Sequence, residues 1–241
     1  MLNSPAEQVA FAHYPKTAGS SLIAWFRDRF PDAAYSDPGS YHTPVRESLE
    51  QLNLVAGRST RPKVLRECLR FARQLAPRVM TRLERCDLRI IGVVREPFEM
   101  LVSLYEYWRR YDFEQEPDAD LIRSARTGTF RDFLRLAVCE RLLCNYDTYF
   151  DVGGVAWPTT RLIDFRSLEP GLAAVCREFG IEPPVRLGRH NAAPGDQRDL
   201  GPYFAEAGGL MFEVRNHFRW YYDEADAVLV RGDGPRLSRA A

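Results

Sequence analysis

The stretch AHYPKTAGSSLIAWF, residues 12–26, decides the fold that we predict. It joins a mostly apolar run, Gln8 to Tyr14, to an amphipathic segment from Ser20 to Phe30. The first run predicts a short strand that is buried on both faces. The second predicts a helix because its apolar residues recur at helical spacing and Pro31 follows its end. The stretch therefore predicts a strand, a tight loop and a helix in succession.

The same alternation returns further along the chain. Residues 89–94 (RIIGVV) predict a buried strand, and a long helix follows from Pro97. Residues 161–165 predict another strand, followed by a helix over residues 169–179. Strands that alternate with helices indicate an α/β fold with a central parallel β-sheet flanked by helices. Further expected elements are a strand near residues 33–36, helices over residues 44–54, 62–86 and 130–150, a polar connection over 114–125, a polar loop over 189–202 and a largely helical end over 204–230.

Length and composition indicate one ordinary globular domain. The 241 residues suit a single domain over residues 1–241, with a helical insert around residues 44–86. Apolar residues make up 45% and charged residues 27% of the chain, and the formal net charge is zero. This balance argues against nucleic acid as a partner. We also expect no membrane span, because no sufficiently long apolar run is present, and no signal peptide, because the start of the sequence lacks a basic stretch followed by an apolar run and a small-residue cleavage site.

The cysteines and histidines predict neither a disulfide framework nor a metal site. The five cysteines form no CxxC pair, and the four histidines are scattered along the chain. We therefore expect free thiols in a reducing compartment, with a cytoplasmic location, and no bound metal.

The loop between the first strand and the first helix has the chemistry of an anion site. Backbone N–H groups at the start of a helix lack partners within the helix, and the helix dipole favours negative charge there. Lys16, one of only two lysines in the chain, adds a positive charge, and Gly19 allows close approach of a ligand. The alternative is an ordinary turn with Ser20 as the helix cap. A Walker A loop fits poorly because the lysine precedes the glycine.

A second candidate site follows the strand over residues 89–94. Arg95 leaves the carboxyl end of that strand, and Ser103 lies about two turns into the next helix. An arginine fork and a hydroxyl together suit a phosphate. The alternative is a surface arginine paired with Glu96 or Glu99 and a serine bonded to its own helix. Two anion sites at one sheet edge would suit a nucleotide that carries charge at both ends of its ribose.

Both motifs resemble those of a known enzyme family. PKTAGSSL is similar to the 5′-phosphosulfate loop of sulfotransferases that use 3′-phosphoadenosine 5′-phosphosulfate (PAPS), and VVREPFEMLVSLY resembles their 3′-phosphate motif. The likeness is greatest to the carbohydrate-type branch, although Met100 stands where that branch often has an arginine. RLIDFRSLE and RHNAAP resemble later segments of the family more weakly. The resemblance implies a P-loop-like sulfotransferase fold.

The resemblance also implies roles for individual residues. The 5′-phosphosulfate would be held by Lys16, Thr17, Ala18, Gly19, Ser20 and Ser21. The 3′-phosphate would be held by Arg95 and Ser103. Sulfuryl transfer needs a proton acceptor and a group that neutralises the leaving oxygen. We expect Lys16 to serve the leaving oxygen and His42 to act as the base, with Glu47 in reserve, whereas His13 shapes the loop, His190 contacts cofactor or acceptor, and His217 packs.

The implied reaction moves a sulfuryl group from PAPS to a hydroxyl of an acceptor, giving PAP and a sulfate ester. The acceptor would be a sugar of a glycan, glycolipid or polysaccharide precursor. Two other functions stay open: a P-loop-like nucleotide kinase, and a non-catalytic binding module that keeps the nucleotide fold as a scaffold. The sequence leaves the oligomeric state open.

Overall fold

The chain forms an α/β fold around a mixed five-stranded sheet. The structure, a computed structural model, describes residues 1–37, 42–55, 86–110, 120–188 and 199–232. The strands are β1 (Leu2–Ser4), β2 (Val9–Ala12), β3 (Ala34–Tyr35), β4 (Arg89–Val94) and β5 (Thr160–Asp164). Their order across the sheet is β3-β1-β2-β4-β5. The α/β prediction is confirmed, whereas the P-loop-like fold stays a prediction.

The sheet is parallel on its β2-β4-β5 side, where the candidate sites lie, and antiparallel on its β3-β1-β2 side. Strands β2, β4 and β5 are mutually parallel, with Ala12 opposite Gly92 and Val94 opposite Asp164. Strand β1 pairs antiparallel with both β2 and β3. The sequence analysis did not predict β1, because three residues are too few for a readable alternation. The expected parallel sheet is therefore correct for its centre and wrong for its β1–β3 edge.

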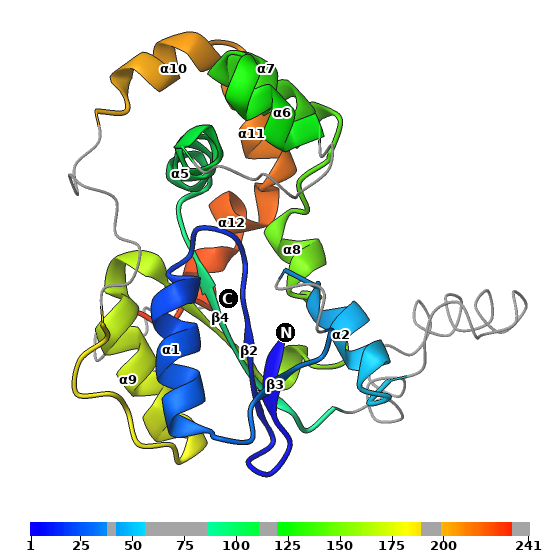
Figure 1. Cartoon of the computed structure of the whole chain (residues 1–241), viewed down its shortest axis with the longest axis vertical. Coiled ribbons are helices and arrows are strands. Elements are labelled where there is room, and N and C mark those ends of the chain that lie inside the picture. The colour runs from blue at the N-terminus through cyan, green and yellow to red at the C-terminus, as the bar shows by residue number, and fades with distance from the viewer. Residues whose placement is uncertain (38–41, 56–85, 111–119, 189–198, 233–241) are drawn as a thin grey trace, which may run out of the picture.

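Helices cover both faces of the sheet. One face packs α1 (Gly19–Arg29) and α9 (Leu168–Phe179) against alternate strand residues such as Ile91 and Val93. The other face packs Ile90 and Val94 against further helices. These include α2 (Val45–Gln51), α5 (Pro97–Arg110), α8 (Tyr146–Tyr149) and α12 (Arg219–Asp223). Burial on both faces explains why β4 reads as a continuous apolar run. Figure 1 shows α1 and α9 side by side on their face of the sheet.

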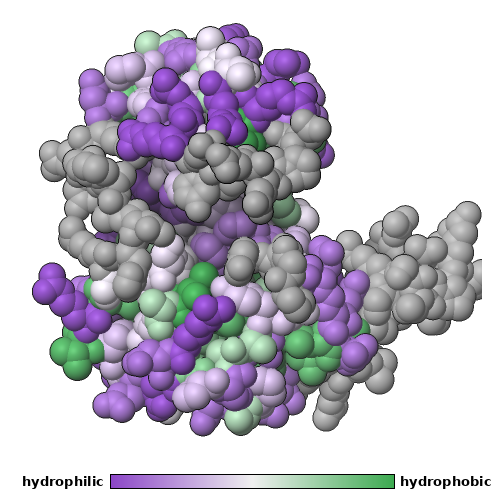
Figure 2. Space-filling view, in the orientation of Figure 1, coloured by the Kyte–Doolittle hydropathy of each residue, from purple (hydrophilic) through white to green (hydrophobic). Residues whose placement is uncertain are grey.

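The remaining helices stand above the sheet in Figure 1 or connect to it. They are α6 (Asp120–Thr127), α7 (Phe130–Leu134), α10 (Gly201–Ala207) and α11 (Leu210–His217), a π-helical turn over Arg135–Cys139 and 3-10 turns over Trp157–Thr159, Phe165–Ser167 and Ala225–Ala227. Hydrophilic side chains dominate the visible surface of this upper region, as Figure 2 shows. No helix within the described ranges is both long enough and apolar enough to cross a membrane.

One long helix that the sequence analysis expected is broken in the structure. The expected helix over residues 130–150 ends after the π-helical turn and restarts at α8. Arg141 has a positive φ of 56°, which a helix does not accept, and Asn145 caps α8 by accepting from the Thr148 N–H. The largely helical end is present as α10, α11 and α12, with Gly208 at a φ of 50° between the first two.

Other expectations are corrected in part or fall outside the described ranges. Helix α6 occupies the end of the expected polar connection, and α10 begins at Gly201, inside the expected polar loop. In the expected insert, α2 is present, whereas residues 56–85 lie outside the described ranges. Most of the late loop, including His190, also lies outside them.

Candidate functional site

The carboxyl ends of three neighbouring parallel strands bring the two sequence motifs to one edge of the sheet. Strand β2 leads into the loop before α1, β4 leads into Arg95, and β5 leads into Phe165. This is the edge at which parallel α/β sheets bind ligands. We call residues 14–19 the anion loop.

The backbone of the anion loop is held in an uncommon conformation. Lys16 and Ala18 have φ values of 61° and 62°, in the left-handed region that non-glycine residues rarely adopt. Each such residue costs on the order of 1 kcal/mol, and such conformations cluster at functional sites. Ala18 is also the N-cap of α1 and makes no side-chain capping hydrogen bond. The first N–H groups of α1 are therefore not satisfied by their own cap.

Packing inside the loop differs from what the sequence suggested for Thr17 and Gly19. The buried Thr17 hydroxyl donates to the Tyr14 carbonyl at 2.8 Å, so it closes the loop rather than facing outward. At Gly19, an added Cβ would lie 1.6 Å from Nε2 of His13. The imidazole, as much as any ligand, therefore requires glycine at this position.

His13 is held neutral beneath the loop. Loss of solvation lowers the pKa of its imidazole to about 3, and the neighbouring His42 lowers it further. Its Nδ1 atom is buried and has no hydrogen-bond partner within the described residues. His13 therefore shapes the loop without adding charge to it, as the sequence analysis expected.

His42 lies beside the loop in one defined tautomer. Its Nδ1 is 3.0 Å from the backbone oxygen of His13, and the two rings are 4.5 Å apart. A carbonyl oxygen only accepts, so Nδ1 must carry the hydrogen and Nε2 of the neutral ring keeps its lone pair. His42 is exposed, so Nε2 can accept a proton from a ligand. Glu47, the reserve base, is exposed on the first turn of α2.

The Lys16 side chain connects the loop to α5. Its Nζ lies 4.1 Å from the centroid of the Tyr107 ring, a cation–π contact. Tyr107 is one helical turn beyond the half-buried Ser103, so both residues share a face of α5. The lysine of the first motif therefore reaches the helix face that carries the serine of the second. The sequence analysis assigned Tyr107 no role.

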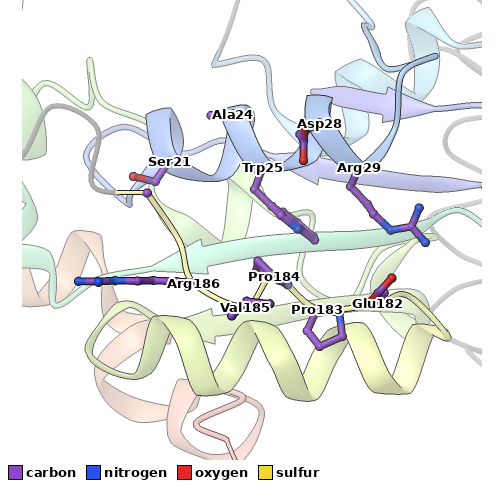
Figure 3. A pocket seen from close by; sticks show the side chains of 11 residues that line it. Ser21, Ala24, Trp25, Asp28, Arg29, Glu182, Pro183, Pro184, Val185 and Arg186 are labelled. Atoms are coloured by element: carbon purple, nitrogen blue, oxygen red, sulfur yellow. The ribbon is translucent and has the colours of Figure 1, made fainter.

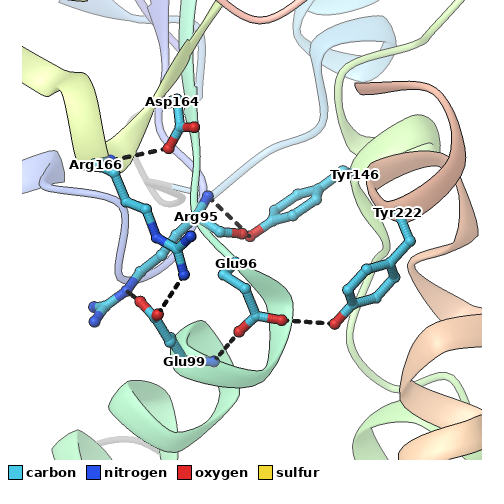
Figure 4. Close-up of polar contacts among 7 residues, drawn as sticks. All are labelled: Arg95, Glu96, Glu99, Tyr146, Asp164, Arg166 and Tyr222. Atoms are coloured by element: carbon cyan, nitrogen blue, oxygen red, sulfur yellow. Dashed lines mark hydrogen bonds and ion pairs between the residues drawn. The ribbon is translucent and has the colours of Figure 1, made fainter. Parts of the chain in front are cut away.

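Arg95 is fixed by four contacts. Its backbone N–H and carbonyl bond to the Tyr146 hydroxyl at 3.3 and 2.8 Å. Its Nε lies 3.4 Å from Glu99, and its guanidinium lies 4.6 Å from the centre of the Phe165 ring. The Arg95–Glu99 ion pair is the alternative to a phosphate site that the sequence analysis left open. However, both Nη groups have no hydrogen bond to the described residues, and Figure 4 shows them turned away from the carboxylates.

A network of polar side chains surrounds Arg95, and Figure 4 draws it. Glu99 also pairs with Arg166 at 2.7 Å. Glu96 accepts from the Glu99 backbone N–H at 2.7 Å, which caps α5, and from the Tyr222 hydroxyl at 2.7 Å. These contacts restrict where the start of α5, and with it Arg95, can move.

Helix α8 holds the backbone at both motifs in place. Tyr146 bonds to the backbone of Arg95, and the Tyr149 hydroxyl donates to the backbone oxygen of His13 at 2.6 Å. Both tyrosines pack edge-on against the buried Tyr14 ring. A single turn of helix therefore links the end of β4 to the end of β2.

A groove of about 540 Å³ runs beside α1, as Figure 3 shows. One wall is the exposed side of α1, and the other is the segment that follows α9. Ser21, the last residue of the first motif, lies at one end of it. The sequence analysis did not expect this groove. Its lining residues are Ser21, Ala24, Trp25, Asp28, Arg29, Glu182, Pro183, Pro184, Val185, Arg186 and Gly188.

The described residues contain no group of three or more His, Cys, Asp or Glu side chains that could hold a metal ion. His217 bonds through Nε2 to the Leu143 carbonyl at 2.8 Å, and burial lowers its pKa, which fits the packing role expected for it. Comparisons of the chain with protein-family models, with curated proteins and with solved structures found no match.

Proposed function

We propose that the chain is a PAPS-dependent sulfotransferase that acts on a hydroxyl, with a sugar of a glycan, glycolipid or polysaccharide precursor as the acceptor. One observation carries the proposal. Two neighbouring parallel strands, β2 and β4, end in cationic elements that differ in kind and lie at one edge of the sheet. The anion loop offers backbone N–H groups and Lys16, and the end of β4 offers the Arg95 fork.

The two elements suit the two ends of the donor nucleotide. The N–H groups at the start of α1, with the hydroxyls of Ser20 and Ser21, would hold the 5′-phosphosulfate. Arg95, joined by Ser103, would hold the 3′-phosphate, because its two Nη groups form a fork that matches phosphate oxygens. Thr17 and Ala18 would contribute through the loop backbone. The neutral His13 leaves Lys16 as the positive side chain of the loop itself.

The reaction that follows is an in-line displacement at sulfur. The acceptor oxygen forms a new S–O bond while the bond from sulfur to the bridging oxygen of the 5′-phosphate breaks. The acceptor proton passes to Nε2 of His42, whose tautomer leaves that nitrogen as an acceptor. Lys16 and the N–H groups of α1 stabilise the charge that develops on the departing phosphate. The products are a sulfate ester and PAP.

A transfer assay with labelled PAPS and a panel of hydroxyl-bearing sugars tests the proposal. We expect Lys16→Ala to lower turnover by about 100- to 1000-fold, the cost of one well-placed oxyanion donor. Lys63→Ala is the matched control, because Lys63 is the other lysine of the chain. His42→Ala should lower kcat by about 100-fold or more and leave the affinity for PAP unchanged.

Calorimetry separates this proposal from its rivals. The sulfotransferase should bind PAP without Mg²⁺ and should bind ATP no better when Mg²⁺ is added. Tight Mg²⁺-dependent binding of ATP would instead support a kinase. Binding of PAP without transfer to any acceptor would support a non-catalytic module. The proposal includes the cytoplasmic location, which suits the free thiols that the described part of the chain has at Cys86, Cys139, Cys144 and Cys176.

A further inference from the structure

One carboxylate at the sheet edge binds two arginines from neighbouring strand ends. Glu99 contacts Nε of Arg95 through one oxygen at 3.4 Å and Nη2 of Arg166 through the other at 2.7 Å. The arginines meet because β4 and β5 are paired in parallel, with Val94 opposite Asp164. Figure 4 shows the two guanidinium groups on either side of this carboxylate. We call Arg95, Glu99 and Arg166 the Glu99 cluster.

The Glu99 cluster keeps an excess of positive charge. Two guanidinium groups share one carboxylate, so the cluster carries a net charge of +1. Of the neighbouring carboxylates, Asp164 pairs with Arg231 at 3.0 Å, whereas Glu96 accepts from two uncharged donors, the Tyr222 hydroxyl and the Glu99 backbone N–H. Within the cluster, an incoming anion therefore meets two guanidinium groups that share a single carboxylate.

Both arginines also have donors to spare. The Nη groups of Arg95, and the Nε and Nη1 groups of Arg166, make no hydrogen bond to the described residues. The Arg166 side chain is 61% exposed, so its donors are accessible, whereas Arg95 is 23% exposed. A phosphate dianion offers three oxygens and can accept from two forks at once.

The backbone around Arg166 is prepared for this position. Its N–H donates to the Asp164 carboxylate at 2.9 Å, which closes the turn after β5. The preceding residue, Phe165, lies under the Arg95 guanidinium at 4.6 Å. The same turn therefore supports one arginine through an aromatic face and presents the other.

We propose that Arg166 is a second phosphate ligand, and that the Glu99 cluster makes the site prefer an adenosine bisphosphate over a 5′-monophosphate. The proposal rests on the proposed function, since it assigns the 3′-phosphate to this end of the site. Glu99 acts as a positioning residue. Its single carboxylate holds the guanidinium groups of Arg95 and Arg166 close together, so that both can bind a phosphate dianion.

Calorimetry with PAP and with adenosine 5′-monophosphate tests the proposal. Wild-type protein should bind PAP much more tightly than the monophosphate. Arg166→Gln should weaken PAP binding by about tenfold and leave monophosphate binding unchanged, so the preference falls by the same factor. Arg166→Lys, which keeps the charge, should recover part of the loss. Because the Arg166 side chain is 61% exposed, the fold should survive the change.

Arg161→Gln is the matched control. Arg161 lies on β5 itself and, like Arg166, pairs with a glutamate, Glu178, at 2.6 Å, but it is near the start of the strand, whereas Arg166 follows its end. This variant should bind both nucleotides as the wild-type protein does. The outcomes are distinct. If wild-type protein binds neither nucleotide, the proposed function fails. If it prefers PAP and Arg166→Gln keeps that preference in full, only the role of Arg166 fails.

Discussion

The two candidate anion sites lie on neighbouring strands and are built in opposite ways. The anion loop after β2 is made of backbone, with two left-handed residues and a glycine pressed against an imidazole. The Glu99 cluster after β4 and β5 is made of long side chains held by opposite charge. The first site is shaped by packing before any ligand arrives, whereas the second is shaped by charges that salt screens. Steric changes should therefore damage the first site most.

Gly19→Ala should produce the largest effect on stability. Its Cβ would lie 1.6 Å from Nε2 of His13, so the ring or the loop must move. We expect a loss of about 3 kcal/mol in the free energy of unfolding, at the upper end of overpacking costs, and a loss of PAP binding. Urea unfolding measures the first and calorimetry the second.

A double-mutant cycle provides the control for this prediction. In a His13→Ala background the obstructing ring is absent, so Gly19→Ala should cost less than about 1 kcal/mol. Equal costs in both backgrounds would show that the imidazole does not confine the loop. The comparison between a packed site and a charged site would then lose its main support.

The buried imidazole also predicts how stability depends on pH. The folded pKa of His13 is about 3, against 6.5 for an unperturbed histidine, so below pH 6.5 the unfolded state binds a proton that the folded state refuses. Stability from this group is present above pH 6.5 and falls toward pH 3, by up to about 1.4 kcal/mol per pH unit.

Urea unfolding at several pH values between 7 and 4 measures this slope. His13→Gln removes the titrating group and should flatten the slope by about one proton. His217, whose pKa is also lowered, remains in both proteins and cancels in the difference. If the two slopes coincide, His13 does not stay neutral beneath the loop.

The two tyrosines of α8 allow each site to be weakened separately. Tyr146→Phe removes the hydroxyl that bonds to both backbone groups of Arg95, and Tyr149→Phe removes the one that bonds to the carbonyl shared with His42. Each should cost about 1–2 kcal/mol of stability, because a buried carbonyl loses a partner. Tyr146→Phe should weaken PAP binding, whereas Tyr149→Phe should lower turnover more than affinity. If both variants changed PAP affinity and turnover in the same way, the two tyrosines would not act on separate sites.

The sequence predicted the elements whose signals are local. β4 was predicted with its observed bounds because the five residues 90–94 are apolar and lie between two arginines, and α1 was predicted within one residue at each end. The break near Arg141 was missed because a positive φ in a non-glycine residue leaves no mark in hydrophobic periodicity.

In the candidate site, too, the sequence could predict what depends on local signals and could not predict contacts between distant parts of the chain. The positions of Lys16 and Arg95 could be predicted, since Arg95 directly follows one readable strand and Lys16 lies in the short loop after another. The Arg166–Glu99 pair could not, because it depends on the spatial order of β4 and β5 and joins side chains 67 residues apart in the chain. The inward bond of the Thr17 hydroxyl was equally hidden, since a serine or threonine in such a loop can face either way.

The smallest expected effect concerns the contact that joins the two sites. Tyr107→Leu removes the ring beneath the Lys16 ammonium, which is worth about 0.5–1 kcal/mol at a partly exposed position. Reductive methylation with ¹³C keeps the charge of both lysines of the chain, so Lys63 serves as an internal reference for Lys16. The ring current of Tyr107 should shift the Lys16 methyl resonance upfield.

The shift should persist in Tyr107→Phe, which keeps an aromatic face, and disappear in Tyr107→Leu. Adding PAP should move the wild-type resonance downfield, because a charge-assisted hydrogen bond to phosphate, at about 1.5–3 kcal/mol, exceeds the cation–π contact. An upfield resonance that survives in Tyr107→Leu would place the ammonium elsewhere. If the Lys16 methyl resonance does not shift when PAP is added, the ammonium stays in contact with Tyr107 on α5. The anion loop would then have to bind its anion through backbone N–H groups alone.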